Sequence, residues 1–144
     1  MNMPTFSRSN VPTLPRSNAS LDLSIIIVNW NTRDLLADCL RSVYDTVRGL
    51  TFEVFVVDNA SADGSAAMVR DRFPQVLLIE NTENVGFARA NNQAIERSSG
   101  RYIVLLNSDT VVQPQAFAAL IRFMESQPAA GACGPYLLNA DGAL

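Results

Sequence analysis

The stretch LSIIIVNW, residues 23–30, decides the fold of this chain. It is a nearly continuous apolar run that ends in polar residues, which is typical of a strand buried on both faces, as in a parallel sheet. Residues 31–47 then place apolar side chains on one helical face, with Asn31 or Thr32 able to cap the start and Gly49 after the end. That face comprises Leu35, Leu36, Cys39, Leu40, Val43, Tyr44 and Val47.

The alternation of strand and helix continues along the chain. Further buried strands are predicted at residues 52–61, 75–81 and 101–109. Helices are predicted before Pro74, within residues 85–100 and from Pro114 through Gln127, and a last strand is expected to lead into a hairpin turn at Asp141-Gly142. Such alternation implies an α/β fold with a mostly parallel sheet and right-handed crossovers.

Polar residues follow three of these predicted strands, as the segments Asn29–Asn31, Asp58–Ser61 and Asn107–Asp109. Ligands of such sheets bind beyond the carboxyl ends of the strands, so we expect the three segments to meet at one crevice. Each also has a plain structural alternative, because Asp58 can form an Asx turn and Asn-Ser-Asp is an ordinary turn sequence.

The residue types indicate what such a crevice could bind. Asp58 could accept a hydrogen bond from a nucleobase or a sugar hydroxyl, and Trp30 could form an apolar wall beside a base or pack in the core. Gly86 could turn the chain into a helix whose first N–H groups bind phosphate with help from Arg89, the alternative being a plain helix start with a solvated arginine. Asp109 could be one carboxylate of a Mg²⁺ or Mn²⁺ site, with Asn107 binding ribose or the waters of the metal.

Composition narrows the choice of function. The chain has no histidine, so acid–base or metal chemistry would have to use carboxylates, which favour hard cations. With 11 basic and 14 acidic residues, the net charge of −3 gives no reason to expect nucleic acid as a partner. No apolar run is long enough for a transmembrane segment, and residues 1–20 lack the apolar region of a secretory signal.

The two cysteines and the first residues lead to expectations of location and order. Cys39 and Cys133 lie among apolar residues and form no CxxC pair, so we expect both to be small buried side chains in a reducing cytoplasm. We expect residues 1–20 to be a disordered tail and the fold to begin near Leu21.

The motifs SIIIVNWN, FEVFVVDNASADGS, ENVGFARANNQAI and GRYIVLLNSDTVV, together with the later GACGPYLLNADGAL, resemble the nucleotide-binding half of a family 2 glycosyltransferase. The resemblance implies the GT-A fold, a Rossmann-like, mostly parallel sheet flanked by helices. It implies transfer of a sugar, with inversion, from a UDP- or dTDP-sugar to a glycan or lipid-linked acceptor, with a divalent cation, Mg²⁺ or Mn²⁺. The NVGFA and LNSD motifs are similar to those of rhamnosyltransferase-like enzymes of bacterial surface-polysaccharide synthesis.

Carried over by position, the resemblance gives each segment a role. Asp58 would meet the base, with Trp30 and Asn31 on the base and ribose side. Asn107-Ser108-Asp109 matches the DXD-type motif of the family, with Asp109 as metal ligand. A further segment would lie near the diphosphate and donor sugar, and its candidate residues are Asn84, Gly86, Arg89 and Asn92. Ala90 departs from the glycine that is frequent in the family, and Asn107 replaces the first aspartate of the strict motif.

Family 2 enzymes take their general base and acceptor site from residues well after the DXD-type motif. We therefore expect residues 21–144 to be an incomplete GT-A portion, truncated at its carboxyl end, with the base beyond Leu144. The enzyme would act in the cytoplasm, peripherally at the inner face of the membrane. The alternative is a non-catalytic nucleotide-binding fragment, or one that self-associates into a homo-oligomer through exposed apolar surface. A receiver domain is disfavoured because Asn29-Trp30-Asn31 stands where an acidic pair would be needed.

Overall fold

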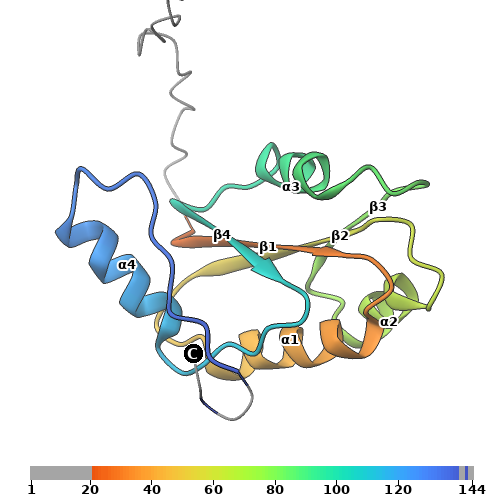
Figure 1. Cartoon of the computed structure of the whole chain (residues 1–144), viewed down its shortest axis with the longest axis horizontal. Coiled ribbons are helices and arrows are strands. Elements are labelled where there is room, and N and C mark those ends of the chain that lie inside the picture. Colours follow the sequence, from red (N-terminus) through yellow and green to blue (C-terminus); the bar gives the residue numbers. More distant parts are fainter. Residues whose placement is uncertain (1–20, 140–141, 143–144) are drawn as a thin grey trace, which may run out of the picture.

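The computed structural model describes residues 21–139 and 142, so the predicted tail at residues 1–20 lies outside the described part. Within that part, strands and helices alternate, and the strands form one parallel sheet in the order β3-β2-β1-β4 (Figure 1). The strands are β1 (Leu23–Asn29), β2 (Phe52–Asp58), β3 (Leu77–Glu80) and β4 (Tyr102–Asn107). The helices are α1 (Arg33–Thr46), α2 (Ser65–Arg72), α3 (Phe87–Ile95) and α4 (Ala116–Ser126).

The apolar run of β1 occupies the centre of the sheet, as predicted from its sequence. Ile26 pairs with Phe55 of β2 on one side and with Leu105 of β4 on the other. The same register aligns Asn29 with Asp58, and Val28 with Asn107. The carboxyl ends of these three strands therefore lie at one level of one edge of the sheet.

Helices cover both faces of the sheet. Helix α3 lies on one face, and α1 and α2 lie on the other, with α4 packed beside them (Figure 1). The α3 face holds the smaller apolar cluster, which consists of Ile26, Phe55, Val57, Ile79, Ala90 and Ala94. The opposite face holds a larger cluster that includes Ile25, Ile27, Leu36, Leu40, Val56 and Phe117. Burying an aliphatic or aromatic side chain contributes roughly 1.5–3 kcal/mol, so the larger cluster is the main source of stability.

Two expectations about burial were wrong. Leu35 is 50% exposed, because it lies one residue before Leu36 and hence about 100° around α1 from the face that meets the sheet. Strand β4 was expected to be a buried strand, yet Ile103 and Leu105 are 43% and 52% exposed. Helix α3 packs against β1 and β2, and it leaves the same face of β4 uncovered.

The ends of the helices and the last segment also differ from expectation. Helix α3 ends at Ile95 instead of continuing toward Gly100, because the N–H groups of Arg97 and Ser98 bond to carbonyls only three residues back. Residues 127–139 contain no strand, and Cys133 is exposed instead of buried. A strand needs a neighbour for its backbone N–H and C=O groups, and in the described part this segment pairs with neither edge strand of the sheet. The predicted turn at Asp141-Gly142 falls partly on residues that are not described.

Candidate functional site

The loops that follow β1 and β2, residues 29–32 and 58–63, are hydrogen-bonded to each other, and we call them the β1–β2 loops. The Asn29 side chain is fully buried, and its amide nitrogen donates to Asp58 Oδ1 at 3.0 Å and to Ser61 Oγ at 3.1 Å. The Asn31 N–H donates to the same Ser61 oxygen at 2.9 Å, and the Ala62 N–H donates to Asn31 Oδ1 at 2.7 Å. The two loops thus hold each other in one arrangement.

Asp58 takes the Asx-turn conformation that the sequence left open as an alternative to a binding role. Its Oδ2 accepts the Ser61 N–H at 3.0 Å, and only 3% of the residue is exposed. Two neighbouring residues, Asn31 and Ala60, have left-handed backbone with φ of 54° and 62°. Non-glycine residues keep such a conformation only where their surroundings enforce it, and they often do so at binding sites.

The turn that follows β4, residues 107–110, forms the opposite side of the same edge, and we call it the β4 turn. Asn107 and Asp109 are exposed, whereas the half-buried Ser108 hydroxyl lies 2.9 Å from the Thr32 hydroxyl. The Cys39 thiol lies beneath this turn, 3.6 Å from the Asn107 carbonyl oxygen. Asn29–Asn31, Asp58–Ser61 and Asn107–Asp109 therefore do converge, as predicted.

Thr32 occupies the N-cap position of α1, but its side chain does not cap the helix. Asp63 does so from the other loop, since its Oδ2 accepts the Arg33 N–H at 2.8 Å, while its Oδ1 accepts from the Ser65 N–H and hydroxyl at the start of α2. Partial burial by itself raises the pKa of the Asp63 carboxyl, but the hydrogen bonds from Ser65 and Arg33 outweigh it and hold this pKa below its ordinary value. Sequence reasoning missed Asp63, although Asp-Gly-Ser before a helix is a cap-like signal.

The loop between β3 and α3 is tied to the end of β2 by Asn59, a second residue that sequence reasoning missed. The buried Asn59 side-chain oxygen accepts from the Asn81 amide at 3.0 Å and from the Val85 N–H at 3.3 Å. Asn84 Oδ1 then accepts the Gly86 N–H at 2.9 Å, and Gly86 has a φ of 83° that favours glycine. The helix start predicted at Gly86 is therefore present and joined to the β1–β2 loops.

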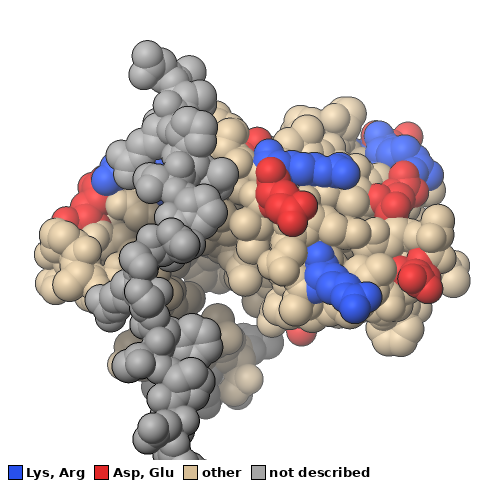
Figure 2. Space-filling model, turned by 90° about the horizontal axis from the view of Figure 1, so that it is seen from above, with Lys and Arg blue, Asp and Glu red and all other residues tan. Residues whose placement is uncertain are grey.

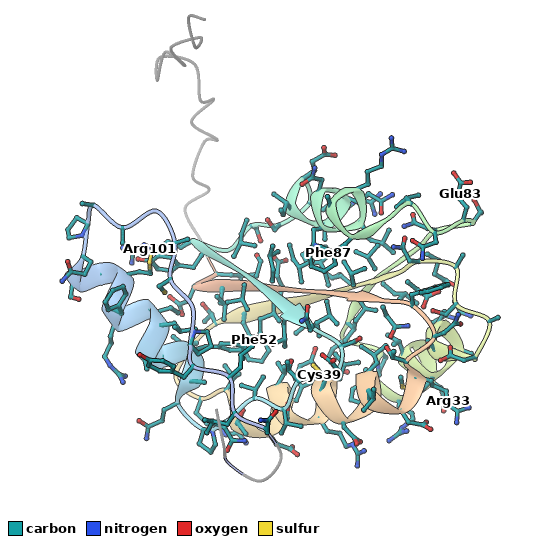
Figure 3. All side chains as sticks on the ribbon, viewed as in Figure 1. Arg33, Cys39, Phe52, Glu83, Phe87 and Arg101 are labelled. Carbon is teal, nitrogen blue, oxygen red and sulfur yellow. The ribbon has the colours of Figure 1, made fainter. Side chains whose placement is uncertain are left out.

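The remaining predicted residues are less closely tied to this edge. Trp30 is 57% exposed, so the core-packing alternative was wrong. Arg89 and Asn92 lie at exposed positions of α3, and within the described residues neither side chain bonds to the three strand-end segments. Figure 3 shows Phe87, at the start of α3, on the side of the sheet opposite Cys39 and Arg33, which belong to α1.

The β4 turn offers oxygen ligands for a cation. Asp109 and Asn107 are exposed there, and among the described residues no cluster of three or more His, Cys, Asp or Glu could hold a metal by itself. One carboxylate with an amide oxygen suits Mg²⁺ or Mn²⁺ when substrate phosphates and water supply the other ligands. The donor set therefore fits a hard cation that arrives with its substrate.

Other features of the described part limit further chemistry. Burial raises the pKa of the Cys39 thiol to about 11, so this cysteine is not a nucleophile at neutral pH. Figure 2 shows basic and acidic side chains interspersed over the face seen from above. A protein surface that binds the phosphates of a nucleic acid would instead gather basic side chains. None of the described helices has the length and apolar character that a membrane crossing requires.

Several known proteins resemble this chain in sequence or structure, and those described below are sugar transferases or polysaccharide-synthesis proteins. The succinoglycan biosynthesis protein ExoO of Rhizobium meliloti is 36% identical over 112 residues, which cover 77% of this chain and 31% of that protein. The poly(ribitol-phosphate) beta-glucosyltransferase of Bacillus spizizenii is 32% identical over 108 residues, or 72% and 17% of the two chains. A mannosyltransferase of Pyrobaculum calidifontis, solved with GDP-Man and Mn²⁺, has a TM-score of 0.66 at 25% identity and matches 88% of this chain and 38% of its own.

The described sheet has the GT-A fold of that solved structure, and this chain spans less than half the length of each of the three proteins named above. The family model of glycosyl transferase family 2 matches residues 24–142. This match covers most of the chain, which therefore belongs to glycosyl transferase family 2.

Proposed function

We propose that this chain carries the donor site of a sugar transferase of bacterial surface-polysaccharide synthesis. The observation that carries the proposal is the convergence of the β1–β2 loops and the β4 turn at one edge of the sheet, with Thr32 and Ser108 in contact across it. The edge combines two polar loops that are hydrogen-bonded to each other, an exposed tryptophan and an exposed turn with oxygen ligands. These are the elements needed to hold a base, a ribose and a diphosphate.

Each side chain has a distinct part in this proposal. Asp58 accepts from the base and Trp30 lies against its apolar face, while Asn31 lines the ribose side. Gly86 and the first turn of α3 face the diphosphate, and Arg89 or Asn92 reaches the donor sugar. Asp109 and Asn107 would hold a divalent cation. When bound, such a cation offsets the charge that grows on the leaving diphosphate.

The acceptor side is not assigned to this chain. The proposal already uses Asp58 at the base, and Asp63 caps two helices, so neither carboxylate is left to take a proton from an acceptor hydroxyl. We expect an inverting transfer in which a carboxylate other than these two is the general base. Positioning of the donor is the contribution that the described residues make.

For the donor, we propose a uridine or thymidine diphosphate sugar of the kind that rhamnosyltransferase-like enzymes use. GDP is the second candidate, because the similar mannosyltransferase was solved with GDP-Man and Mn²⁺. Isothermal titration of the folded chain with UDP, dTDP and GDP, each with Mn²⁺ and with EDTA, tests the proposal. We expect one nucleotide to bind more tightly with Mn²⁺, and binding of none would overturn the donor site.

A non-catalytic, self-associating module is a second candidate, favoured by the exposed apolar residues of β4. Ile103 and Leu105 are half-exposed on a strand that, in the described part, pairs only with β1. An uncovered apolar strand edge can pair with another chain. Light scattering distinguishes this candidate, because a protein that stays monomeric across a wide concentration range would contradict it.

A further inference from the structure

A chain of four side chains crosses the candidate site from one side to the other. Ser108 in the β4 turn contacts the Thr32 hydroxyl at 2.9 Å, and Thr32 donates to Asn29 Oδ1 at 2.6 Å. The other end of the Asn29 amide donates to Asp58 at 3.0 Å. Within the described residues, it is the side-chain path that joins the proposed cation position to the proposed base position.

The direction of every hydrogen bond in this chain follows from its chemistry. A carboxylate only accepts, so the Asn29 nitrogen must face Asp58 and the Asn29 oxygen must face Thr32. Thr32 has one hydroxyl proton, and it is used on Asn29. Ser108 must therefore donate its own proton to Thr32, and this hydrogen bond ties the β4 turn to the start of α1.

Two features of the structure keep this direction fixed. Asn29 is fully buried, so water does not compete for its amide. The hydroxyl of Thr32 would ordinarily cap α1, but Asp63 takes over that role by accepting the Arg33 N–H. Hydrogen bonds aligned in one direction polarise one another, so the negative charge of Asp58 orders the whole chain.

We propose that Asn29 and Thr32 are positioning residues, which hold Ser108 and thereby the β4 turn that carries Asp109, the proposed cation ligand. This inference rests on the proposed function, since it assigns the cation and the nucleotide to this edge. It predicts that the cation side depends on a hydroxyl at position 32, although Thr32 itself touches neither cation nor nucleotide.

The test compares Thr32→Val with Thr32→Ser and with Thr46→Val as a matched control. Valine keeps the shape of threonine without its hydroxyl, and serine restores the hydroxyl. Thr46 lies at the far end of α1, where its hydroxyl donates to the Ser42 carbonyl. The affinity of the folded full chain for UDP, dTDP and GDP is measured in Mn²⁺ and again in EDTA, and melting temperatures verify that each variant folds.

We expect Thr32→Val to weaken nucleotide binding about three- to tenfold in Mn²⁺, a loss that corresponds to one hydrogen bond. In EDTA the loss should be less than about twofold. Thr32→Ser and Thr46→Val should bind like the natural chain. A Thr32→Val variant that binds normally in Mn²⁺ would overturn the proposal. An equal loss in Mn²⁺ and EDTA would also overturn it, because a general structural defect has that effect.

A second measurement separates this inference from the proposed function. If none of the nucleotides binds, Mn²⁺ alone is titrated into ¹⁵N-labelled protein, and the paramagnetic broadening of the Ser108 and Asp109 amide signals is followed. Broadening that needs more Mn²⁺ in Thr32→Val than in Thr32→Ser supports the positioning role even though the nucleotide site has failed. Absence of broadening in the natural chain, or equal broadening in both variants, contradicts it.

Discussion

At the ends of β1 and β2 the polar side chains are buried and bonded to one another, whereas at the end of β4 they are exposed. Asn29 and Asp58 are almost fully enclosed in the β1–β2 loops, while Asn107 and Asp109 in the β4 turn face outward. The first side is already ordered and loses little conformational entropy when a ligand binds. The second side keeps its oxygens free, as a site must do if the ligand supplies most of the coordination.

The largest effect should come from breaking the ordered side at its centre. Asn29→Ala removes three side-chain hydrogen bonds and leaves the buried Asp58 carboxylate without one of its donors. We expect the free energy of unfolding to fall by about 2–4 kcal/mol. Urea denaturation measures this loss.

Asn92→Ala is the matched control for that variant, because Asn92 is exposed on α3. Its effect should lie within about 0.5 kcal/mol. If the two variants were equally stable, Asn29 would not organise the β1–β2 loops.

A smaller loss is expected at Asp63, which joins the same loops to two helices. Asp63→Ala leaves the starts of α1 and α2 without their cap, at a cost of about 1–2 kcal/mol. Asp34→Ala, which alters an exposed acid in the first turn of α1, should change stability by less than about 1 kcal/mol.

The pH dependence of unfolding provides a check on Asp63. The folded-state pKa of this carboxyl lies below its ordinary value, so its contribution is complete above that ordinary value and is lost as the pH falls through the folded-state pKa. The stability difference between the natural chain and Asp63→Ala should therefore shrink below about pH 4. A difference that stays constant down to pH 2 would contradict the capping role.

The smallest effect concerns the support beneath the β4 turn. Cys39→Ala removes a buried sulfur that contacts the Asn107 carbonyl, and we expect a loss of about 1 kcal/mol. Cys133→Ala is the control, because Cys133 is exposed and its removal should leave the melting temperature unchanged. A Cys39→Ala variant as stable as Cys133→Ala would mean that the thiol does not support the turn.

Both the β1–β2 loops and the β4 turn could be located from the sequence, because each follows an apolar run. Apolar runs at residues 23–30, 52–61 and 101–109 indicated three parallel strands, and polar residues at their ends indicated a shared edge. Strand ends are local features of a sequence, so the segments of the candidate site could be named in advance. The family resemblance assigned them roles in binding, which stay predictions.

The contacts that order the site could not be predicted in the same way. Asn29 reaches Asp58 across 29 positions of the chain, and Thr32 reaches Ser108 across 76, so neither pair leaves a pattern in the local sequence. Asp63 caps α1 in place of Thr32 because the fold brings it to the start of that helix from 30 positions away in the chain.

Burial at the edge of the sheet was equally hard to predict. Ile103 and Leu105 belong to a strand as apolar as β1, but they are exposed because α3 packs on β1 and β2 instead. A strand at residues 130–139 was expected from its apolar residues alone. In the described part these residues pair with neither edge strand of the sheet, so no strand forms there.

The most direct test of the account is nucleotide binding by Asp109→Ala, measured calorimetrically with UDP, dTDP and GDP in Mn²⁺ and in EDTA. Asp109 is exposed, so its removal should leave the melting temperature unchanged. We predict that the natural chain binds one of these nucleotides at least about tenfold more tightly with Mn²⁺, and that Asp109→Ala loses this enhancement but keeps the affinity seen in EDTA. An Asp109→Ala variant that retains the full Mn²⁺ enhancement would contradict the placement of the cation at the β4 turn.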